Sequence, residues 1–337
     1  TRQFLDALSG DAANDANLIG QFGVGFYSAF LVAKKVELTT RHASQPADGG
    51  VRWVSDGEGE YSIESVNREE RGTSITLHLR DEDKEFAEDF RLRGIISRYS
   101  DHISLSIEMP TQDKEKQGEW ETVNSGSALW SRPKNEISEE EYQRFYQSLS
   151  YDTETPLATL HNRVEGNLEY TSLFFIPQKA PFDLWDREQR HGINLYVRRI
   201  FIMDDAKYLM PSFLRFVRGV VDAADLPLNV SREFLQNNKD IDRIRSASVK
   251  KILSELSRLA EKEPETYAAF WKEFGKVLKE GVVEDHDNRT VLADLMRFNS
   301  TRSEDTAQTE SLAAYFTRMP IKQKAIYYIT ADSHNAA

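Results

Sequence analysis

Three glycines at G-x-x-G-x-G spacing, Gly20, Gly23 and Gly25, open an apolar segment that runs to Val32. Because glycine lacks a Cβ and accepts positive φ, consecutive N–H groups in such a run can turn toward one anion. A helix that begins near Val24 adds the positive end of its dipole. On spacing alone such glycines are more often a tight turn or a close-packing device, and a phosphate site is the alternative.

The order of these glycines excludes two common nucleotide motifs. A dinucleotide fold needs G-x-G-x-x-G after a strand, and the order here is reversed. A Walker loop needs Gly-Lys followed by Ser or Thr, whereas Gly275-Lys276 is followed by Val277 in a helical pattern.

A second group with chemical potential is Asn229-Val230-Ser231-Arg232-Glu233-Phe234-Leu235-Gln236, which follows a turn at Leu226-Pro227-Leu228. This position places Arg232 on a loop or on the first turn of a helix. An arginine there can stabilise a transferring γ-phosphate, because its planar fork is always cationic and makes paired hydrogen bonds. The alternative is a surface ion pair of Arg232 with Glu233 or Asp225, which contributes little.

Further motifs follow one another along the chain and, together with the glycine run, resemble one family. They are Arg71-Gly72-Thr73, Tyr99-Ser100-Asp101-His102, Arg163-Val164-Glu165-Gly166, Phe175-Ile176-Pro177, Ala180-Pro181-Phe182-Asp183-Leu184, Leu195-Tyr196-Val197-Arg198-Arg199-Ile200-Phe201-Ile202, Asp225 to Glu233, and Ile326-Tyr327-Tyr328-Ile329-Thr330. In this order they resemble the heat-shock protein 90 chaperones, most closely the bacterial members. The resemblance covers essentially all 337 residues.

The resemblance implies roles for particular residues, each of which also has a structural alternative. Gly20, Gly23, Val24, Gly25 and Phe26 would bind the nucleotide on its phosphate side, and Thr73 would reach the adenine through water. Arg232 and Gln236 would belong to the catalytic loop. Phe182 and Leu226 would form an apolar patch that meets the nucleotide domain or client segments. The alternatives are an inward strand residue for Thr73 and ordinary core for Phe182 and Leu226, which burial would distinguish.

The resemblance also implies which part of the family's architecture is present. The chain corresponds to the second half of the amino-terminal ATP domain and to the middle domain. The family's general base, magnesium-binding asparagine and adenine-reading aspartate would precede Thr1, and its dimerisation domain would follow Ala337. We therefore expect ATP with magnesium as the cofactor of the parent protein, which would be a homodimer, and none bound by this chain alone.

Two functions follow from the resemblance. The parent would be a cytoplasmic, stress-response ATPase that couples ATP hydrolysis to the folding of client proteins. The alternative for this chain is an ATP-independent scaffold that binds unfolded or partly folded clients. Topoisomerase and mismatch-repair ATPases are other possible parents, but their second domains usually present lysine where this chain has Ser231-Arg232-Glu233.

Composition is ordinary for a two-domain protein of this length. The formal charge of −12 disfavours binding to nucleic acid or to an anionic membrane surface. With no cysteine, the chain has no disulfide, cysteine nucleophile or thiolate metal site, which is compatible with a reducing cytoplasm, and its seven histidines form no H-x-x-x-H pair. No metal site is expected.

We expect an α+β fold in which a partial helix-on-antiparallel-sheet layer of the Bergerat ATP-binding type, residues 1–110, precedes an α/β middle domain, residues 130–337. Alternation predicts strands at 36–40, 51–54 and 73–79, and helical spacing predicts a helix over 87–100. We also expect this half-layer to expose an apolar face. The charged segment 111–129 would be a linker or a hairpin between 103–109 and 120–123.

The middle domain is expected to have an α/β part at 130–238, helices at 239–286 and a small α/β part at 287–337. Strands are predicted at 157–164, 168–176, 192–197 and 200–203, and the run 325–330 resembles a strand. Apolar residues spaced by three and four predict helices over 241–259, 267–278 and 291–296, with a break at Glu263-Pro264. The aromatic stripe from Tyr267 to Phe274 is expected to be core.

Overall fold

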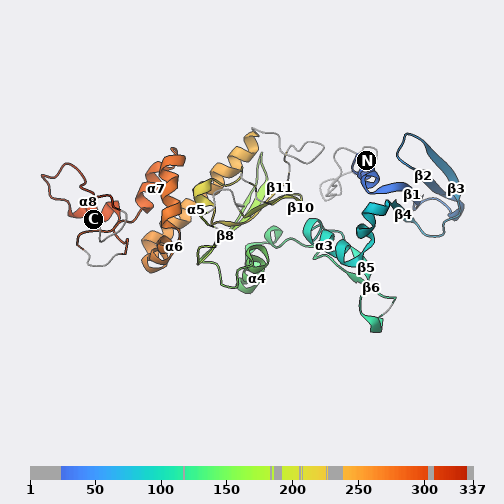
Figure 1. Ribbon diagram of the computed structural model, residues 1–337, viewed down its shortest axis with the longest axis horizontal. Coiled ribbons are helices and arrows are strands. Elements are labelled where there is room, and N and C mark those ends of the chain that lie inside the picture. Colours follow the sequence, from blue (N-terminus) through green and yellow to red (C-terminus); the bar gives the residue numbers. More distant parts are fainter. Residues whose placement is uncertain are drawn as a thin grey trace. The chain divides into compact units, whose positions relative to one another are not determined.

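The computed structural model describes residues 24–331 except 117, 183, 186–191, 205, 207, 225, 227–237 and 303–306. The chain forms two compact units, Thr1–Gly126 and Ser127–Ala337. Figure 1 shows the elements of each unit in sequence colours. The boundary falls within the segment that we expected to be a linker or hairpin.

The first unit contains one four-stranded antiparallel sheet in the order β3-β2-β1-β4. Its elements are η1 (Gly25–Leu31), β1 (Ala33–Arg41), η2 (Ala47–Gly49), β2 (Gly50–Ser55), β3 (Tyr61–Val66), β4 (Gly72–Leu79), η3 (Asp81–Ala87), α3 (Asp89–Tyr99), β5 (Glu108–Pro110), η4 (Lys114–Lys116) and β6 (Trp120–Thr122). The three predicted strands and the predicted helix are confirmed, and β3 was not predicted.

Strand register gives this sheet one apolar face. Trp53 lies opposite both Ile63 and Leu38, and Leu38 lies opposite Ile75. Since directly opposed residues of antiparallel strands point to the same side, these four form one row across the sheet. Ile63 is 61% exposed and Ile75 is 51% exposed. The described residues therefore leave much of this face uncovered, as the sequence led us to expect.

The opposite face carries charge. Glu37 contacts Lys35, Arg52 and His78, and Arg52 also pairs with Glu64. Hydrogen bonds from Lys35 and then Arg52 lower the pKa of Glu37 to about 2. This network on the polar face leaves the apolar face for other contacts.

The charged segment that begins after β5 is bounded by two paired strands. β5 and β6 pair antiparallel, with Met109 opposite Glu121. Asn124 stabilises the base of the hairpin, because its Oδ1 accepts the Ile107 N–H at 2.8 Å. This pairing agrees with the hairpin alternative, which is compatible with the linker alternative.

The second unit is built on a five-stranded mixed sheet in the order β10-β9-β11-β8-β7, in which β9 and β11 are parallel. Its elements are η5 (Leu129–Ser131), η6 (Lys134–Glu136), α4 (Glu139–Ser150), β7 (Ala158–Val164), β8 (Tyr170–Ile176), β9 (Ile193–Val197), β10 (Ile200–Met203), η7 (Ser212–Leu214), β11 (Arg218–Ala223), α5 (Lys239–Lys262), α6 (Pro264–Glu284), α7 (Arg289–Leu295) and α8 (Leu312–Arg318). All four predicted strands are confirmed, whereas β11, α4 and α8 were not predicted.

Helices pack against both faces of this sheet, and α4 and α5 lie on opposite sides of it in Figure 1. One core joins Trp130 and Tyr146 to Phe175 of β8. The larger core joins Phe174 and other residues of the opposite sheet face to α5, α6 and α7. Successive residues Phe174 and Phe175 thus serve different cores, because side chains alternate along a strand.

Helices α5 and α6 follow the predicted spacing, and the break falls where expected. Pro264 occupies the first turn of α6, where its missing N–H costs nothing. The aromatic stripe on α6 is core, since Tyr267, Phe270, Trp271 and Phe274 are at most 4% exposed. That prediction is confirmed.

The expected strand at 325–330 does not form. These residues have no strand partner among the described part of the chain, and Tyr327, Tyr328 and Ile329 are between 70% and 82% exposed. β-prone residues need a neighbouring strand to complete their backbone hydrogen bonds.

In the described ranges no helix is long and apolar enough to cross a bilayer.

A buried histidine on β7 connects the sheet to η5 and to α4. His161 on β7 is 6% exposed, with Nε2 2.8 Å from the Trp130 carbonyl oxygen and Nδ1 2.8 Å from the Tyr142 hydroxyl. The carbonyl can only accept, so Nε2 carries the proton and Nδ1 accepts from Tyr142. Burial lowers the pKa of His161, because desolvation disfavours the imidazolium.

This histidine makes stability depend on pH. The unfolded chain binds a proton near the ordinary pKa of about 6.5, whereas folded His161 resists it, so stability falls as pH drops below that value. We expect a slope of at most about 1.4 kcal/mol per pH unit from this group. Urea unfolding of the chain and of His161→Gln between pH 7.5 and 5 measures it. Equal slopes in the two proteins would contradict the assignment.

Candidate functional site

Thr73 lies at the start of β4, on the apolar face of the first sheet. Thr73 lies opposite Thr40 of β1, and Thr40 lies opposite Val51 of β2. The Thr40 hydroxyl donates to the Gly72 carbonyl oxygen at 3.2 Å, and the two threonine hydroxyl oxygens are 2.8 Å apart. Since the Thr40 proton is used on the carbonyl, Thr73 donates to Thr40. The Thr73 oxygen is left able to accept a further hydrogen bond.

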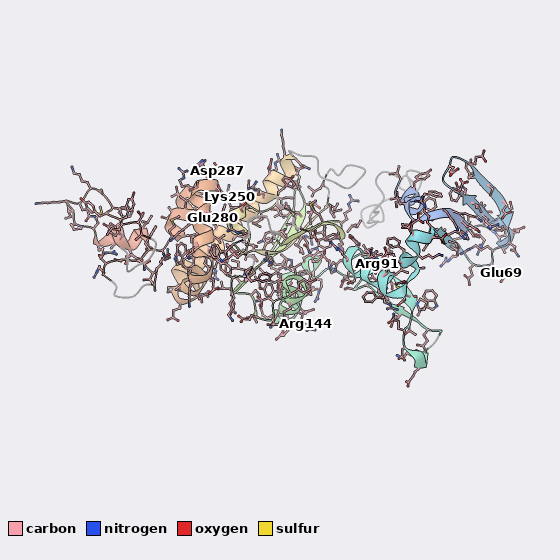
Figure 2. The ribbon with its side chains drawn as sticks, viewed as in Figure 1. Glu69, Arg91, Arg144, Lys250, Glu280 and Asp287 are labelled. Carbon is pink, nitrogen blue, oxygen red and sulfur yellow. The ribbon has the colours of Figure 1, made fainter. Side chains whose placement is uncertain are left out.

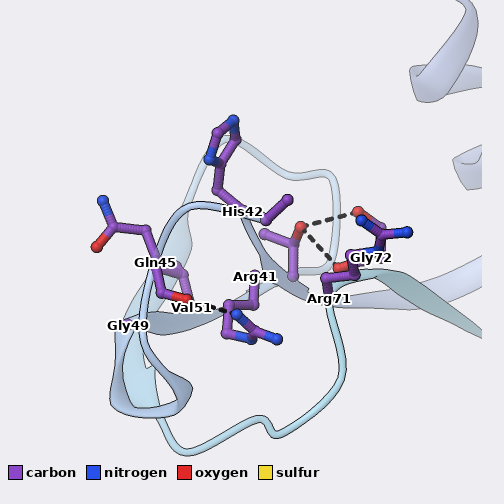
Figure 3. A pocket seen from close by; sticks show the side chains of 10 residues that line it. Arg41, His42, Gln45, Gly49, Val51, Arg71 and Gly72 are labelled. Atoms are coloured by element: carbon purple, nitrogen blue, oxygen red, sulfur yellow. Dashed lines mark hydrogen bonds between the residues drawn. The ribbon is translucent and has the colours of Figure 1, made fainter.

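A cavity of about 880 Å³ opens beside Thr73. Its lining residues come from the ends of β1, β2 and β4 and from the turn after β1: Thr40, Arg41, His42, Ala43, Gln45, Gly49, Val51, Arg71, Gly72 and Thr73. Figure 3 shows these side chains and the hydrogen bonds of Thr40. The volume lies in the range of about 300–1,000 Å³ that is typical of small-molecule sites.

The cavity combines apolar walls with a few polar groups. Arg41 is held in place, because its guanidinium donates to the backbone oxygens of Gln45 and of Glu69. His42 contacts the Ser44 hydroxyl through Nδ1. Together with the Thr73 oxygen, these groups give the cavity a few polar contacts among its apolar walls.

The described part of the glycine run forms η1, a 3₁₀ helix with Val24 as its N-cap. Gly25 has open space where a Cβ would lie, and its carbonyl accepts the Ser28 hydroxyl at 2.6 Å. The Phe26 ring packs edge-on against Trp53 at 5.8 Å between centroids. Gly20 and Gly23 lie outside the described residues, so their roles remain predictions.

The structure brings two of the predicted groups to one face of the sheet. Phe26 contacts Trp53, which belongs to the apolar row with Leu38, and Thr73 belongs to the adjacent row along β1 and β4. Adjacent rows on one face lie two residues apart, which is about 7 Å along a strand. Phe26 of η1 and Thr73 therefore lie on the same side of the sheet.

Arg232 and Gln236 lie outside the described residues, and their catalytic roles remain predictions. The described chain on either side is well packed. Leu226 is 2% exposed, and Asn238 caps α5 by accepting the Asp240 N–H at 2.8 Å.

Phe182 and Leu226 differ sharply in burial. Phe182 is 96% exposed, whereas Leu226 lies in the larger core. Partial exposure is the property that we expected of a docking patch. Phe182 is almost fully exposed and the side chain of Leu226 is buried, so the role of both residues in such a patch remains a prediction.

Sequence reasoning missed several residues around these sites. Arg41, at the end of β1, and His42, in the turn after it, line the cavity, and no local motif marks this position. Arg215 and Glu280 form a bidentate ion pair at 2.8 and 3.0 Å, although 65 residues separate them. A capping box did mark α4, since Ser138 is followed three residues later by Glu141.

Comparison with known proteins gives a consistent result. Residues 110–337 match the family described as "Hsp90 protein". The chain is 59% identical over 343 residues to the "Chaperone protein HtpG" of Nitrosococcus oceani, 57% over 348 residues to that of Nitrosospira multiformis and 56% over 342 residues to that of Actinobacillus succinogenes. Each alignment covers 100% of this chain and 54% of the relative.

The chain therefore spans about half the length of these relatives. The family match covers most of the chain, and the likeness to the relatives extends through both units. These matches agree with the α+β architecture, with an antiparallel sheet and helices in the first unit and a mixed sheet between helices in the second. On this evidence the chain belongs to the Hsp90 family.

Proposed function

We propose that this chain is the client-binding part of an ATP-driven molecular chaperone. The observation that carries the proposal is the identity of 59% to a named chaperone over the whole chain. Exposed apolar side chains support it, because chaperones bind unfolded chains through such surface. Phe182 at 96%, Trp185 at 56% and Tyr208 at 55% exposure provide such surface in the second unit.

In the full-length protein, ATP with magnesium would bind on the apolar face of the first sheet. The N-terminal end of η1 would approach the phosphates. The Thr73 hydroxyl would accept a hydrogen bond from a water molecule that also contacts the base. Arg232 would stabilise the γ-phosphate during transfer, with Gln236 beside it in the catalytic loop. The cavity beside Thr73 and the shared face of Phe26 and Thr73 support this arrangement.

For the 337-residue chain by itself, we propose client binding without a response to ATP. The motifs that it shares with the family supply phosphate-side and catalytic-loop residues, but they include no general base. An enzyme that lacks the group activating the attacking water loses hydrolysis even where other contacts persist. We further propose that the full-length protein is a cytoplasmic homodimer.

The test is suppression of aggregation. A thermally unfolding client such as citrate synthase is heated with increasing amounts of this chain, and light scattering is followed with and without magnesium and ATP. We expect scattering to fall by about half or more at a few-fold molar excess, equally in both conditions. Serum albumin at equal mass is the control. Scattering that is no lower than in the albumin control would refute client binding, and ATP-dependent suppression would refute the second proposal.

A further inference from the structure

Phe182 lies between Pro181 and Leu184, whose backbone groups are hydrogen-bonded to each other. The Leu184 N–H donates to the Pro181 carbonyl oxygen at 3.0 Å, so the chain turns at the exposed phenylalanine. Leu184 itself is 3% exposed and belongs to the larger core. An apolar ring next to a buried leucine would ordinarily gain by folding inward as well. The outward position of Phe182 therefore depends on contacts that fix the backbone beside it.

Three residues on one face of α6 are connected to this turn. Two of them contact it directly, and the third does so through Arg215. Glu273 Oε2 accepts the Ala180 N–H at 3.0 Å, where the chain enters the turn. The Lys276 ammonium lies 5.9 Å from the centre of the Trp185 ring, where the chain leaves it. Glu280, labelled on α6 in Figure 2, lies seven residues after Glu273 and so on the same helix face.

Arg215 joins Glu280 to the turn. Its Nε donates to the Leu184 carbonyl at 2.7 Å, and its two terminal nitrogens contact the two Glu280 oxygens at 2.8 and 3.0 Å. Nη1 also donates to the Ser212 carbonyl at 2.9 Å. Arg215 is 5% exposed, so its guanidinium is largely out of water, whereas the Glu280 side chain is 21% exposed.

The geometry of this network requires an arginine. The planar guanidinium donates toward Leu184 and toward Glu280 in fixed directions, which a lysine ammonium cannot reproduce. A buried ion pair adds little net stability compared with apolar packing. What the arginine adds is a fixed distance between the Leu184 backbone and α6.

The backbone of α6 comes close enough for this contact because of Gly281. A Cβ at that position would lie 2.8 Å from the Phe213 ring. Phe213 belongs to η7, which immediately precedes Arg215. The close approach of η7 and α6 thus brings Arg215 and Glu280 together.

We propose that Arg215 is a positioning residue for client binding: with Glu280 and Glu273 it holds the 180–185 turn so that Phe182 is presented to an apolar segment of an unfolded client. The proposal rests on the proposed client-binding function. In this proposal the Arg215–Glu280 pair keeps Phe182 exposed without contacting the Phe182 side chain.

Hydrogen exchange followed by mass spectrometry tests the mechanical part. In Arg215→Lys, we expect exchange in peptides covering 180–185 to rise by about fivefold or more, with peptides of α5 unchanged. Glu273→Ala should raise exchange in the same peptides without disturbing a buried charge. The matched control is Arg258→Lys, because Arg258 pairs instead with Glu255 on α5 and with Glu263 just after it.

A double-mutant cycle tests the functional part. The probe is fluorescein-labelled, reduced and carboxymethylated α-lactalbumin, which stays unfolded, and fluorescence anisotropy gives its Kd for the chain. We expect Phe182→Ala to raise Kd by about fivefold and Arg215→Lys by about threefold. In the Phe182→Ala background, Arg215→Lys should have no further effect, because the side chain that it positions is gone.

The outcomes separate this inference from the function on which it rests. If Phe182→Ala leaves Kd unchanged, the proposed client contact fails. If Phe182→Ala raises Kd while Arg215→Lys leaves both exchange and Kd at the wild-type values, or adds fully to Phe182→Ala, the positioning role of Arg215 is overturned. Should Arg215→Lys fail to fold, the same cycle with Glu273→Ala decides.

Discussion

Replacing Gly219 with alanine is expected to destabilise the second unit by about 3 kcal/mol or more. Gly219 lies on β11, the central strand, with β8 on one side and β9 on the other. Its φ is +154°, and a Cβ there would lie 2.2 Å from the Leu173 carbonyl oxygen and 2.9 Å from Phe174 Cα. Both neighbours are backbone atoms of a buried strand, so neither can move aside without breaking the sheet.

Gly166→Ala is the matched control. Gly166 also has a positive φ, +135°, but nothing lies within 4 Å of the position that a Cβ would take. It should therefore show only the backbone strain, about 1 kcal/mol. Urea unfolding followed by tryptophan fluorescence measures both variants. A Gly219→Ala protein within 1 kcal/mol of wild type would show that the sheet can relax around the added methyl group.

Replacing Arg232 with alanine in the full-length protein is expected to lower ATP turnover by about tenfold or more. Arginines that stabilise a transferring phosphoryl group contribute about 10³ to 10⁵ in other enzymes. Nucleotide affinity should change little, because the interaction strengthens in the transition state. Steady-state hydrolysis gives turnover, and calorimetry gives the Kd for ATP.

Arg232→Lys separates charge from geometry. It keeps the positive charge but loses the paired donors, so turnover should fall between that of wild type and that of Arg232→Ala. Unchanged turnover in Arg232→Ala would refute the catalytic role. Loss of ATP affinity in proportion to turnover would instead assign Arg232 to ground-state binding.

Periodicity predicted the elements whose sequence pattern is strong. Helices α5 and α6 have regular apolar spacing, and Pro264 marks the break between them. β11 was missed because Gly219 and the charged residues Arg218 and Asp222 interrupt a short apolar run. Such a strand is specified by its two neighbours in the sheet and not by its own sequence.

The run at 325–330 shows the opposite failure. Tyr327, Tyr328 and Ile329 favour strands, but strand formation also needs a partner, and sequence pattern does not reveal whether one is present. The small α4 helix was missed because its residues are mostly polar, although Ser138 and Glu141 gave a usable signal.

The candidate site was predictable only in part. Family motifs pointed to Thr73 and Phe26; strand register places Thr73 on the apolar face, and the ring contact with Trp53 places Phe26 there. The cavity beside Thr73 depends on how the turn after β1 folds back, which spacing alone does not encode. Phe182 and Leu226 come from equally apolar motifs, yet tertiary contacts expose one and bury the other. The ion pair of Arg215 with Glu280 joins residues that are 65 positions apart, so local sequence patterns could not predict it.

The measurement that bears most directly on client binding is an anisotropy titration of this chain against labelled α-lactalbumin in two forms. One form is reduced and carboxymethylated, and the other is native, with its calcium and disulfides intact. We expect saturable binding of the unfolded form, at least about tenfold tighter than the native form and unchanged by magnesium and ATP. Equal affinity for both forms, or no saturable binding of the unfolded form, would contradict a client-binding role for this chain.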